Sequence, residues 1–185
     1  MPEPIPAPPG IALRPVTPAD AEAIAALRSA SRDHLARWEP DEDDSTYTLP
    51  GVRDSIEAAL ARTEAGTGRS YVILEHGRHV GGLLFNTIVL GPYVRTCSVG
   101  YWVAAAETRR GIATEAVRLA KSIAFGELEL DKLRAETLPD NLASQKVLAR
   151  NGFRRLGLTP CYSLTTGRLR DHVLFEILNP RTERP

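Results

Sequence analysis

A short basic segment with small residues, TRRGIAT at residues 108–114, carries the clearest chemical signal in the chain. It follows an apolar, strand-like run and opens an amphipathic helix. A helix N-terminus presents unpaired backbone N–H groups and a partial positive charge, which together bind phosphate. Gly111 and Ala113 leave the backbone accessible, and Arg109 and Arg110 add full charges. The segment predicts an anion site suited to a pyrophosphate, although a basic helix start with small packing residues would give the same string.

A second polar group lies at the start of another predicted helix, Leu142 to Asn151. Asn141 precedes that helix and can cap it by accepting hydrogen bonds from its first N–H groups. Ser144 follows within the first turn. Because an amide can also bind an amide-bearing ligand, Asn141 is interpreted both as an ordinary cap and as a ligand contact.

Composition narrows the class of function. The 185 residues suit one domain, and 23 basic residues balance 23 acidic ones. No global field attracts nucleic acid or an anionic membrane, which argues against nucleic-acid binding as the main task. Cys97 and Cys161 are too isolated to suggest a disulfide scaffold or a zinc site, so no metal is expected. The N-terminus lacks the layout of a signal peptide and no apolar stretch is long enough to span a membrane, so we expect a cytoplasmic protein.

Hydrophobic periodicity predicts a single α+β domain over residues 11–178, with flexible tails at 1–10 and 179–185. The expected strands are Ile11 to Arg14, Ser70 to Glu75, His79 to Leu90, Cys97 to Val103, Lys132 to Thr137, Phe153 to Leu158 and Asp171 to Leu178. The expected helices are Thr17 to Ala30, Arg32 to Trp38, Pro50 to Ala65, Ile112 to Glu127 and Leu142 to Asn151. Short turns in the first half predict an antiparallel meander, and alternating strands and helices in the second half predict a parallel or mixed section.

Two strings, taken in order, carry a family resemblance. GYWVAAAETRRGIATEAV and LPDNLASQKVLARNGFRRLG closely resemble the acetyl-CoA-binding core of GNAT acetyltransferases, in particular the RimJ/RimL branch. The resemblance is strong over about Ser98 to Gly157 and looser over LRPVTPADAEAI and HLARW. It implies the GNAT fold, a mixed central sheet of about six to seven strands flanked by helices and splayed between the fourth and fifth strands.

The resemblance also implies acetyl-CoA as cosubstrate and a set of contacts to it. The implied contacts are Tyr101, Trp102, Val103, Arg109, Arg110, Gly111, Ile112, Ala113, Thr114, Asn141 and Ser144. The strand residues should pair with the pantetheine arm, the loop should cradle the pyrophosphate, and the last two should reach the sulfur region. Thr108 stands where the usual loop begins with Gln or Arg, so we expect a weaker side-chain contact there and binding through the backbone.

For catalysis, the resemblance implies direct attack of a neutral amine on the thioester in a ternary complex. The backbone N–H of Val103 is the candidate oxyanion donor. Many GNAT enzymes carry a Tyr acid where Leu148 stands here, so Ser144 is the first candidate acid and Tyr162 the second. No general base is assigned, because Ser163 occupies the place where similar sequences can carry an acidic residue.

The acceptor is predicted from the weakness of the base. An α-amine has a pKa of about 8 and a lysine side chain about 10.4, so a site without a strong base suits an N-terminus better. The substrate-facing candidates are His34, Trp38, Glu75 and Asn86. The first two are expected on one face of a helix, where they could equally be a packing pair, and Glu75 could equally be a surface residue at a turn.

Three hypotheses stay open. The first is a RimJ/RimL-like enzyme that acetylates the N-terminal α-amine of a protein, possibly ribosomal. The second is acetylation of a small amine such as an antibiotic or polyamine, suggested by the acidic run from Asp41 to Asp44. The third is a GNAT-fold protein that binds acetyl-CoA without turnover. A homodimer is expected by analogy alone.

Overall fold

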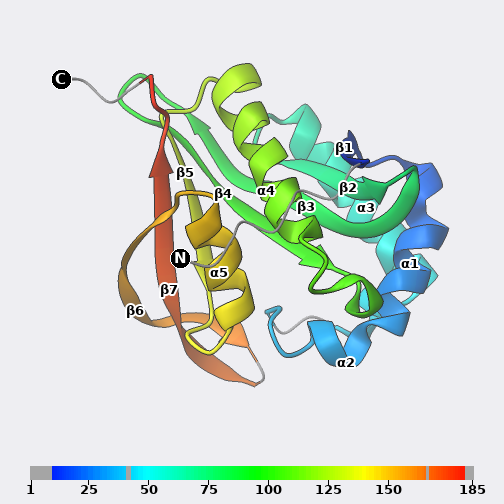
Figure 1. Ribbon diagram of the computed structural model, residues 1–185. Coiled ribbons are helices and arrows are strands. Elements are labelled where there is room, and N and C mark those ends of the chain that lie inside the picture. The colour runs from blue at the N-terminus through cyan, green and yellow to red at the C-terminus, as the bar shows by residue number, and fades with distance from the viewer. Residues whose placement is uncertain (1–9, 41–42, 166, 182–185) are drawn as a thin grey trace.

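The computed structural model describes residues 10–40, 43–165 and 167–181. Seven strands form one sheet in the order β1-β2-β3-β4-β5-β7-β6 (Figure 1). The strands are β1 (Ile11–Pro15), β2 (Arg69–Glu75), β3 (Arg78–Leu90), β4 (Arg95–Val103), β5 (Lys132–Thr137), β6 (Arg154–Thr165) and β7 (Arg168–Leu178). The architecture is α+β with a mixed sheet, as the sequence predicted.

Helices cover both faces of the sheet. They are α1 (Ala21–Ala30), α2 (Arg32–Leu35), α3 (Leu49–Glu64), α4 (Ile112–Ser122) and α5 (Leu142–Arg150). Short turns of other helix types are η1 (Pro18–Asp20), η2 (Asp44–Tyr47), η3 (Ala105–Glu107) and the π-helical η4 (Ile123–Glu127). In Figure 1, α4 and α5 lie across the near face of the sheet, while α1, α2 and α3 gather at its other side.

Two hydrophobic cores follow from these layers. The larger lies between the sheet and α4, whose buried positions Ile112, Ala116, Val117 and Ala120 recur at helical spacing. The smaller lies under α1 and α3 and packs on Val72 of β2. The two faces of the sheet therefore face different layers, and side chains that alternate along one strand enter different environments.

The sheet opens between β4 and β5. These strands pair in parallel only from Thr96 to Ser98, opposite Lys132 to Arg134. Beyond that point β4 stays paired with β3, and β5 stays paired with β7 as far as Thr137. The resulting splay confirms the expectation for the fourth and fifth strands.

The structure corrects the expected helix from Arg32 to Trp38, because α2 ends at Leu35. The chain continues as turns, with the Trp38 N–H donating to the Leu35 carbonyl at 2.9 Å. Pro40 disfavours a helical conformation at the residue before it, Glu39, and Arg28 of α1 holds the Glu39 carboxylate with two hydrogen bonds of 2.8 and 3.1 Å. These two constraints turn the chain back toward α1.

The C-terminal hairpin is longer than the expected strands from Phe153 to Leu158 and from Asp171 to Leu178. Both strands continue to the turn around Gly167, and β6 tolerates Pro160 because it is an edge strand with an irregularity between Thr159 and Ser163. The order also differs from the chain order, because β7 inserts between β5 and β6.

Strand β7 ends at Leu178, but the next residue is still part of the packed structure. Asn179 is buried, and its side-chain amide donates to the Leu130 carbonyl at 2.9 Å.

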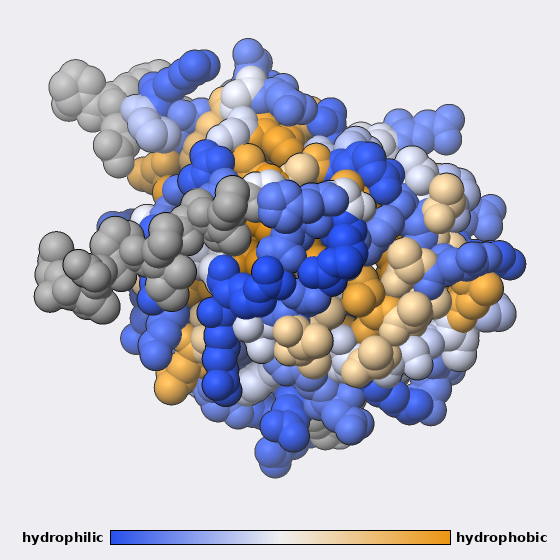
Figure 2. Space-filling view, turned by 45° about the vertical axis from the view of Figure 1, so that its right-hand side comes forward, coloured by the Kyte–Doolittle hydropathy of each residue, from blue (hydrophilic) through white to orange (hydrophobic). Residues whose placement is uncertain are grey.

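Within the described ranges, no helix is long and apolar enough to cross a membrane. The same residues contain no group of three or more His, Cys, Asp or Glu side chains that could hold a metal ion. Figure 2 shows a face on which hydrophilic side chains surround smaller apolar areas.

Candidate active site

The edge of β4 that faces the splay presents free backbone groups. Ala104 donates its N–H to the Val80 carbonyl at 2.9 Å, and the preceding residue, Val103, lies opposite Gly81. In an antiparallel ladder this makes Val103 part of a non-hydrogen-bonded pair, so its N–H points away from β3 and into the splay. Tyr101 repeats the orientation because the pattern alternates along the strand. The splay is therefore lined by backbone donors and acceptors that an extended ligand can use.

One side of the splay is bridged by a pair of hydroxyl groups. The Tyr101 hydroxyl lies 2.9 Å from the Ser144 Oγ and donates to the Ser144 carbonyl at 3.3 Å. Burial raises the pKa of Tyr101 to about 12, although the bond to Ser144 opposes the change. Asn141 caps α5 by accepting from the Ser144 N–H at 3.1 Å. Leu148, at the place of the expected Tyr acid, is fully buried. The geometry pairs the candidate acid Ser144 with Tyr101.

The other side of the splay carries a carboxylate that sequence reasoning missed. The Ser98 Oγ of β4 donates to the Glu136 Oε1 of β5 at 2.7 Å. A local signal was present: in the strand KLRAET, Leu133 and Ala135 are buried, so the alternation places Glu136 on the opposite, open face. A charge inside a central strand that faces no covering helix is a candidate for ligand contact.

Tyr162, the second candidate acid, lies beside this carboxylate. Burial, the negative charge of Glu136 and a hydrogen bond to it all raise the pKa of Tyr162. The Tyr162 and His172 rings lie 5.1 Å apart between their centres, which joins β6 to β7 at this face. Ser98, Glu136 and Tyr162 form a polar group, here called the open-face group, on the side of the splay away from α5.

The loop before α4 has the geometry of an anion site. Arg109 and Gly111 take positive φ values of 63° and 81°, and Gly111 is the N-cap of α4. The first N–H groups of α4, from Ile112 to Thr114, lack helical partners. A cavity of about 320 Å³ begins at the same point. It is lined by Gly111, Thr114, Glu115, Arg118, Lys121, Arg150 and Asn151.

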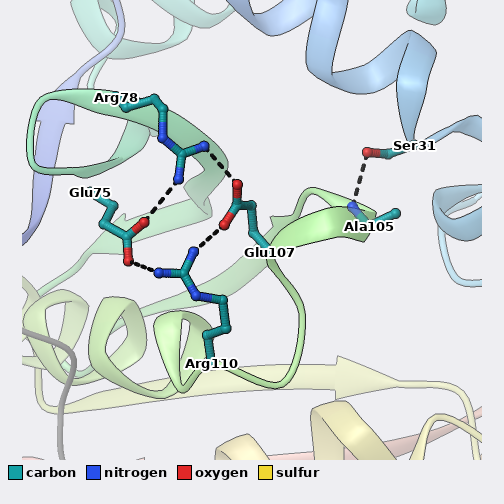
Figure 3. Close-up of polar contacts among 6 residues, drawn as sticks. All are labelled: Ser31, Glu75, Arg78, Ala105, Glu107 and Arg110. Atoms are coloured by element: carbon teal, nitrogen blue, oxygen red, sulfur yellow. Dashed lines mark hydrogen bonds and ion pairs between the residues drawn. The ribbon is translucent and has the colours of Figure 1, made fainter.

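The Arg110 side chain forms ion pairs within the protein, whereas the sequence predicted that it would contact a phosphate. Its guanidinium donates to the Glu75 Oε1 at 2.7 Å and also pairs with Glu107 (Figure 3). Arg78 pairs with the same two carboxylates, at 2.9 Å to Glu75 and 2.6 Å to Glu107. Both Glu75 oxygens are thereby occupied, so this geometry gives no support to a contact between Glu75 and the acceptor.

The Trp102 side chain lies on the face of the sheet that α1 and α3 cover. The Trp102 ring packs over Gly82, where an added Cβ would lie 2.6 Å from the indole nitrogen, and the Arg28 guanidinium lies 5.6 Å from its ring centre. The Trp102 side chain therefore lies on this face. Its backbone is opposite Gly82 in a hydrogen-bonded pair of the ladder, so it points toward β3 and away from the splay, which gives no support to the expected backbone contact of Trp102 with a ligand. Asn86 is exposed and lies opposite Ser98 in the register of β3 and β4.

His34 and Trp38 are both half-buried. His34 belongs to α2 and Trp38 to the turn that follows it, so the two do not share a helix face as expected. Neither side chain is placed against the open-face group by a described contact, and their role as acceptor contacts stays a prediction.

The fold, the splay and the anion loop together define an acetyl-CoA-dependent acyltransferase, and comparisons with known proteins agree. Residues 11–154 match the family described as Acetyltransferase (GNAT) domain. The chain is 33% identical to the probable N-acetyltransferase YjcK of Bacillus subtilis, covering 94% of this chain and 97% of that protein. It is 26% identical to the [ribosomal protein uS5]-alanine N-acetyltransferase of Escherichia coli, covering 92% and 88%.

A solved structure gives the same result. The chain is similar to Mycobacterium smegmatis RimJ in complex with CoA-disulfide, with a TM-score of 0.90, 32% sequence identity, and coverage of 96% of this chain and 86% of that one. This chain therefore belongs to the GNAT acetyltransferases. It is an N-acetyltransferase of the RimJ/RimL type, with acetyl-CoA as its cosubstrate.

Proposed function

We propose that the enzyme acetylates the α-amine of a protein N-terminus, with a ribosomal protein as the acceptor. The observation that carries the proposal is the open-face group, in which the carboxylate of Glu136, a weak base, lies at the mouth of the splay. Such a site suits an amine of pKa about 8 better than a lysine side chain. The relatives named for acetylating uS5 alanine support the same acceptor class. The corresponding compartment is the cytoplasm.

Acetyl-CoA would bind along three features of the site. The pyrophosphate would lie against the first N–H groups of α4, from Ile112 to Thr114. The pantetheine arm would follow the free edge of β4 at Tyr101 and Val103. The nucleotide end would enter the cavity beside Gly111, where Arg118, Lys121 and Arg150 can meet its phosphate charge.

The reacting groups would divide between the two sides of the splay. Glu136 would attract the acceptor ammonium, which must lose one proton to water to become the neutral nucleophile. Glu136 would then take the second proton as the neutral nitrogen attacks the thioester carbonyl. The Val103 N–H would stabilise the oxyanion that forms. When the carbon–sulfur bond breaks, the Tyr101–Ser144 pair would donate a proton to the leaving thiolate. This arrangement gives Ser144 the acid-side role expected from the sequence and adds Tyr101 as its partner.

The acidic run gives little support to a polyamine or aminoglycoside acceptor. Asp43 accepts from the Ser45 N–H at 2.8 Å and caps η2, and Asp44 pairs with Arg32. Both carboxylates have partners within the chain, while Asp41 and Glu42 lie outside the described residues. The homodimer stays a prediction from resemblance, which sedimentation of the purified protein checks.

The test is turnover of acetyl-CoA with a panel of amines, followed by thiol release and by product mass. The panel contains peptides with N-terminal Ala, Ser and Met, a peptide whose only amine is a lysine side chain, spermidine and an aminoglycoside. We expect acetylation at one class of N-terminal α-amine. Turnover of small amines with none of the peptides would overturn the proposal.

A pair of variants in the same assay tests the carboxylate. We expect Glu136→Gln to lower kcat at least about 100-fold, the usual size of a lost acid–base group, and to leave the KM for acetyl-CoA unchanged. Glu176→Gln is the matched control, because Glu176 faces the same side of the sheet but pairs with Arg134 at 3.0 Å. Equal effects from both changes would contradict a specific role for Glu136.

A further inference from the structure

Four charged side chains close into a ring beside the loop that precedes α4, as Figure 3 shows. The members of this ring are Glu75, Arg78, Glu107 and Arg110. Each carboxylate pairs with both guanidinium groups, and each guanidinium pairs with both carboxylates. Three of the four contacts measure 2.6, 2.7 and 2.9 Å, and the fourth joins Arg110 to Glu107. The hydrogen bonds from Arg78 and Arg110 hold the pKa of Glu107 below its usual range, against the effect of burial.

The ring joins segments that are far apart in the chain. Glu75 ends β2 and Arg78 begins β3, which makes them part of the sheet, whereas Glu107 and Arg110 belong to the connection from β4 to α4. Glu75 is only 6% exposed, so the ring attaches the connection to a rigid and buried point. Arg110 is the residue immediately before Gly111, the N-cap of α4.

A second attachment holds the other end of the same connection. The buried Ser31, between α1 and α2, accepts a hydrogen bond from the Ala105 N–H at 3.0 Å (Figure 3). The connection is therefore fixed at two places. Arg109, with its positive φ, lies between anchored residues, and Gly111, also with a positive φ, directly follows the anchored Arg110. Because binding weakens when a loop must be ordered by the ligand, anchors of this kind favour affinity.

We propose that this ring is a positioning device for cosubstrate binding, which holds the first N–H groups of α4 in place for the pyrophosphate. The proposal rests on the placement of the pyrophosphate given above and does not depend on the acceptor. The ring also removes an electrostatic obstacle. Two unpaired carboxylates beside a doubly charged pyrophosphate would repel it, and the two arginines neutralise them.

The ring assigns Arg110 a role that differs from a direct phosphate contact. Both of its terminal nitrogens are already engaged, one by each carboxylate. If Arg110 turned toward the phosphate, Glu75 would keep a buried charge with one partner fewer, which is costly. A positioning role and a direct contact therefore predict different behaviour when Glu75 is changed.

The experiment measures the Kd of CoA by calorimetry for Glu75→Gln, Arg110→Met and the double variant. We expect each single change to weaken CoA binding about tenfold, and the double variant to weaken it no further, because residues in one network are not additive. At saturating acetyl-CoA, kcat should stay within about twofold of the parent enzyme. S-acetylpantetheine, which lacks the pyrophosphate, should keep its KM. This separation of KM from kcat would not arise from a general loss of stability.

Arg78→Met supplies an independent variant. Arg78 is 55% exposed, so its loss should leave the protein folded, and it starts a strand of the sheet rather than the loop. We expect Arg78→Met to weaken CoA binding in the same direction. One result would overturn the proposal in favour of a direct Arg110 contact. In that result, Glu75→Gln and Arg78→Met bind CoA normally or more tightly, while Arg110→Met binds it weakly. A lower Tm with unchanged CoA binding in all three variants would overturn it in favour of a purely structural ring.

Two controls complete the design. The pair of Arg69 and Glu127, 3.8 Å apart, lies at the other end of β2, and Arg69→Met with Glu127→Gln should leave CoA binding unchanged. Ala113→Glu places a carboxylate in the first turn of α4 and should abolish binding if the pyrophosphate lies there. Unchanged binding by Ala113→Glu would overturn the placement of the pyrophosphate, and the ring proposal with it. If Ala113→Glu abolishes CoA binding while the ring variants bind CoA as tightly as the parent enzyme, the ring proposal alone is overturned.

Discussion

At the scale of single residues, the hydrogen bond between Tyr101 and Ser144 affects which hydroxyl group can supply a proton. A phenol with a pKa of about 12 stays protonated at neutral pH, so Tyr101 keeps a proton that it can donate. A serine hydroxyl by itself is a poor acid, but one that is hydrogen-bonded to a buried phenol can act together with it as a donor. The two hydroxyls are therefore expected to act as one unit.

This expectation gives a test by substitution. Tyr101→Phe should lower kcat about 100-fold with little change in the KM for acetyl-CoA, and Ser144→Ala should give a similar loss. The double variant should be no worse than the worse single one, because both changes break the same path. Steady-state rates of the three variants measure this. A double variant whose loss equals the product of the two single losses would contradict a shared proton path.

The open-face group illustrates a limit of reading residues from sequence. Asn141 and Ser144 could be named as candidates because they lie in a local motif at a helix start. Glu136 and Ser98 were missed because their bond joins residues 38 positions apart, and neither stands in a motif. The alternation along β5 indicates which face Glu136 occupies, but only the sheet register indicates which partner it meets.

At the scale of elements, the contact between β3 and β4 sets where the splay begins. An added Cβ at Gly81 would lie 2.2 Å from the Trp102 carbonyl oxygen, a distance that no packing arrangement accepts. Gly81 therefore allows β3 to approach the segment of β4 that carries the free backbone edge. The pairing of β2 with β3 is irregular at the same place, because the register shifts between Ile73, which lies opposite Gly81, and Leu74.

The close approach of β3 and β4 at Gly81 gives a prediction for Gly81→Ala. The methyl group must push β4 away from β3, so we expect a loss of about 2 kcal/mol in unfolding free energy and a marked fall in kcat. Gly157→Ala on β6 is the control, because an added Cβ there meets nothing within 4 Å. Denaturant unfolding and steady-state rates check both variants. Normal stability and activity for Gly81→Ala would show that β4 is not held at this distance.

At the scale of the whole molecule, a buried carboxylate joins the N-terminal segment to the sheet. Asp20 accepts from the Thr17 N–H at 2.8 Å, lies 2.8 Å from the His79 Nε2, and pairs with Arg14. Burial alone would raise the pKa of Asp20, but the hydrogen bonds from Arg14, His79 and Thr17 lower it well below its usual range. One side chain therefore links β1, α1 and β3.

The lowered pKa has a consequence for acid stability. A carboxylate whose pKa is lower in the folded state stabilises the fold above its unfolded pKa of about 3.9, and that stability is lost as the pH falls toward the folded value. We expect Asp20→Asn to cost about 2 kcal/mol at pH 7 and to flatten the decline in stability below about pH 5. Unfolding curves from pH 7 to pH 3 measure this. Asp54→Asn, at an exposed site on α3, should behave as the parent protein, and equal curves for both variants would contradict the role of Asp20.

The sequence by itself determined the features that depend on neighbouring residues. Helical spacing of Ala113, Val117 and Ala120 predicts α4, because an amphipathic stripe must face a core. Alternation and turn residues predict the first four strands, and the order of the two motifs places the chain among GNAT enzymes. The sequence did not determine the ends of some elements. At α2, for example, the chain turns where Arg28 of α1 holds the Glu39 carboxylate.

Only the tertiary structure decided the pairings on which the chemistry depends. The insertion of β7 between β5 and β6, and the ion pair of Glu75 with Arg110 across 35 positions, leave no pattern in the local string. The reason is physical: a helix cap or an alternating strand is stabilised within a few residues, whereas a contact across the sheet exists only after the register is fixed. The sequence therefore determined the class of enzyme, and the fold decided which side chains meet at its site.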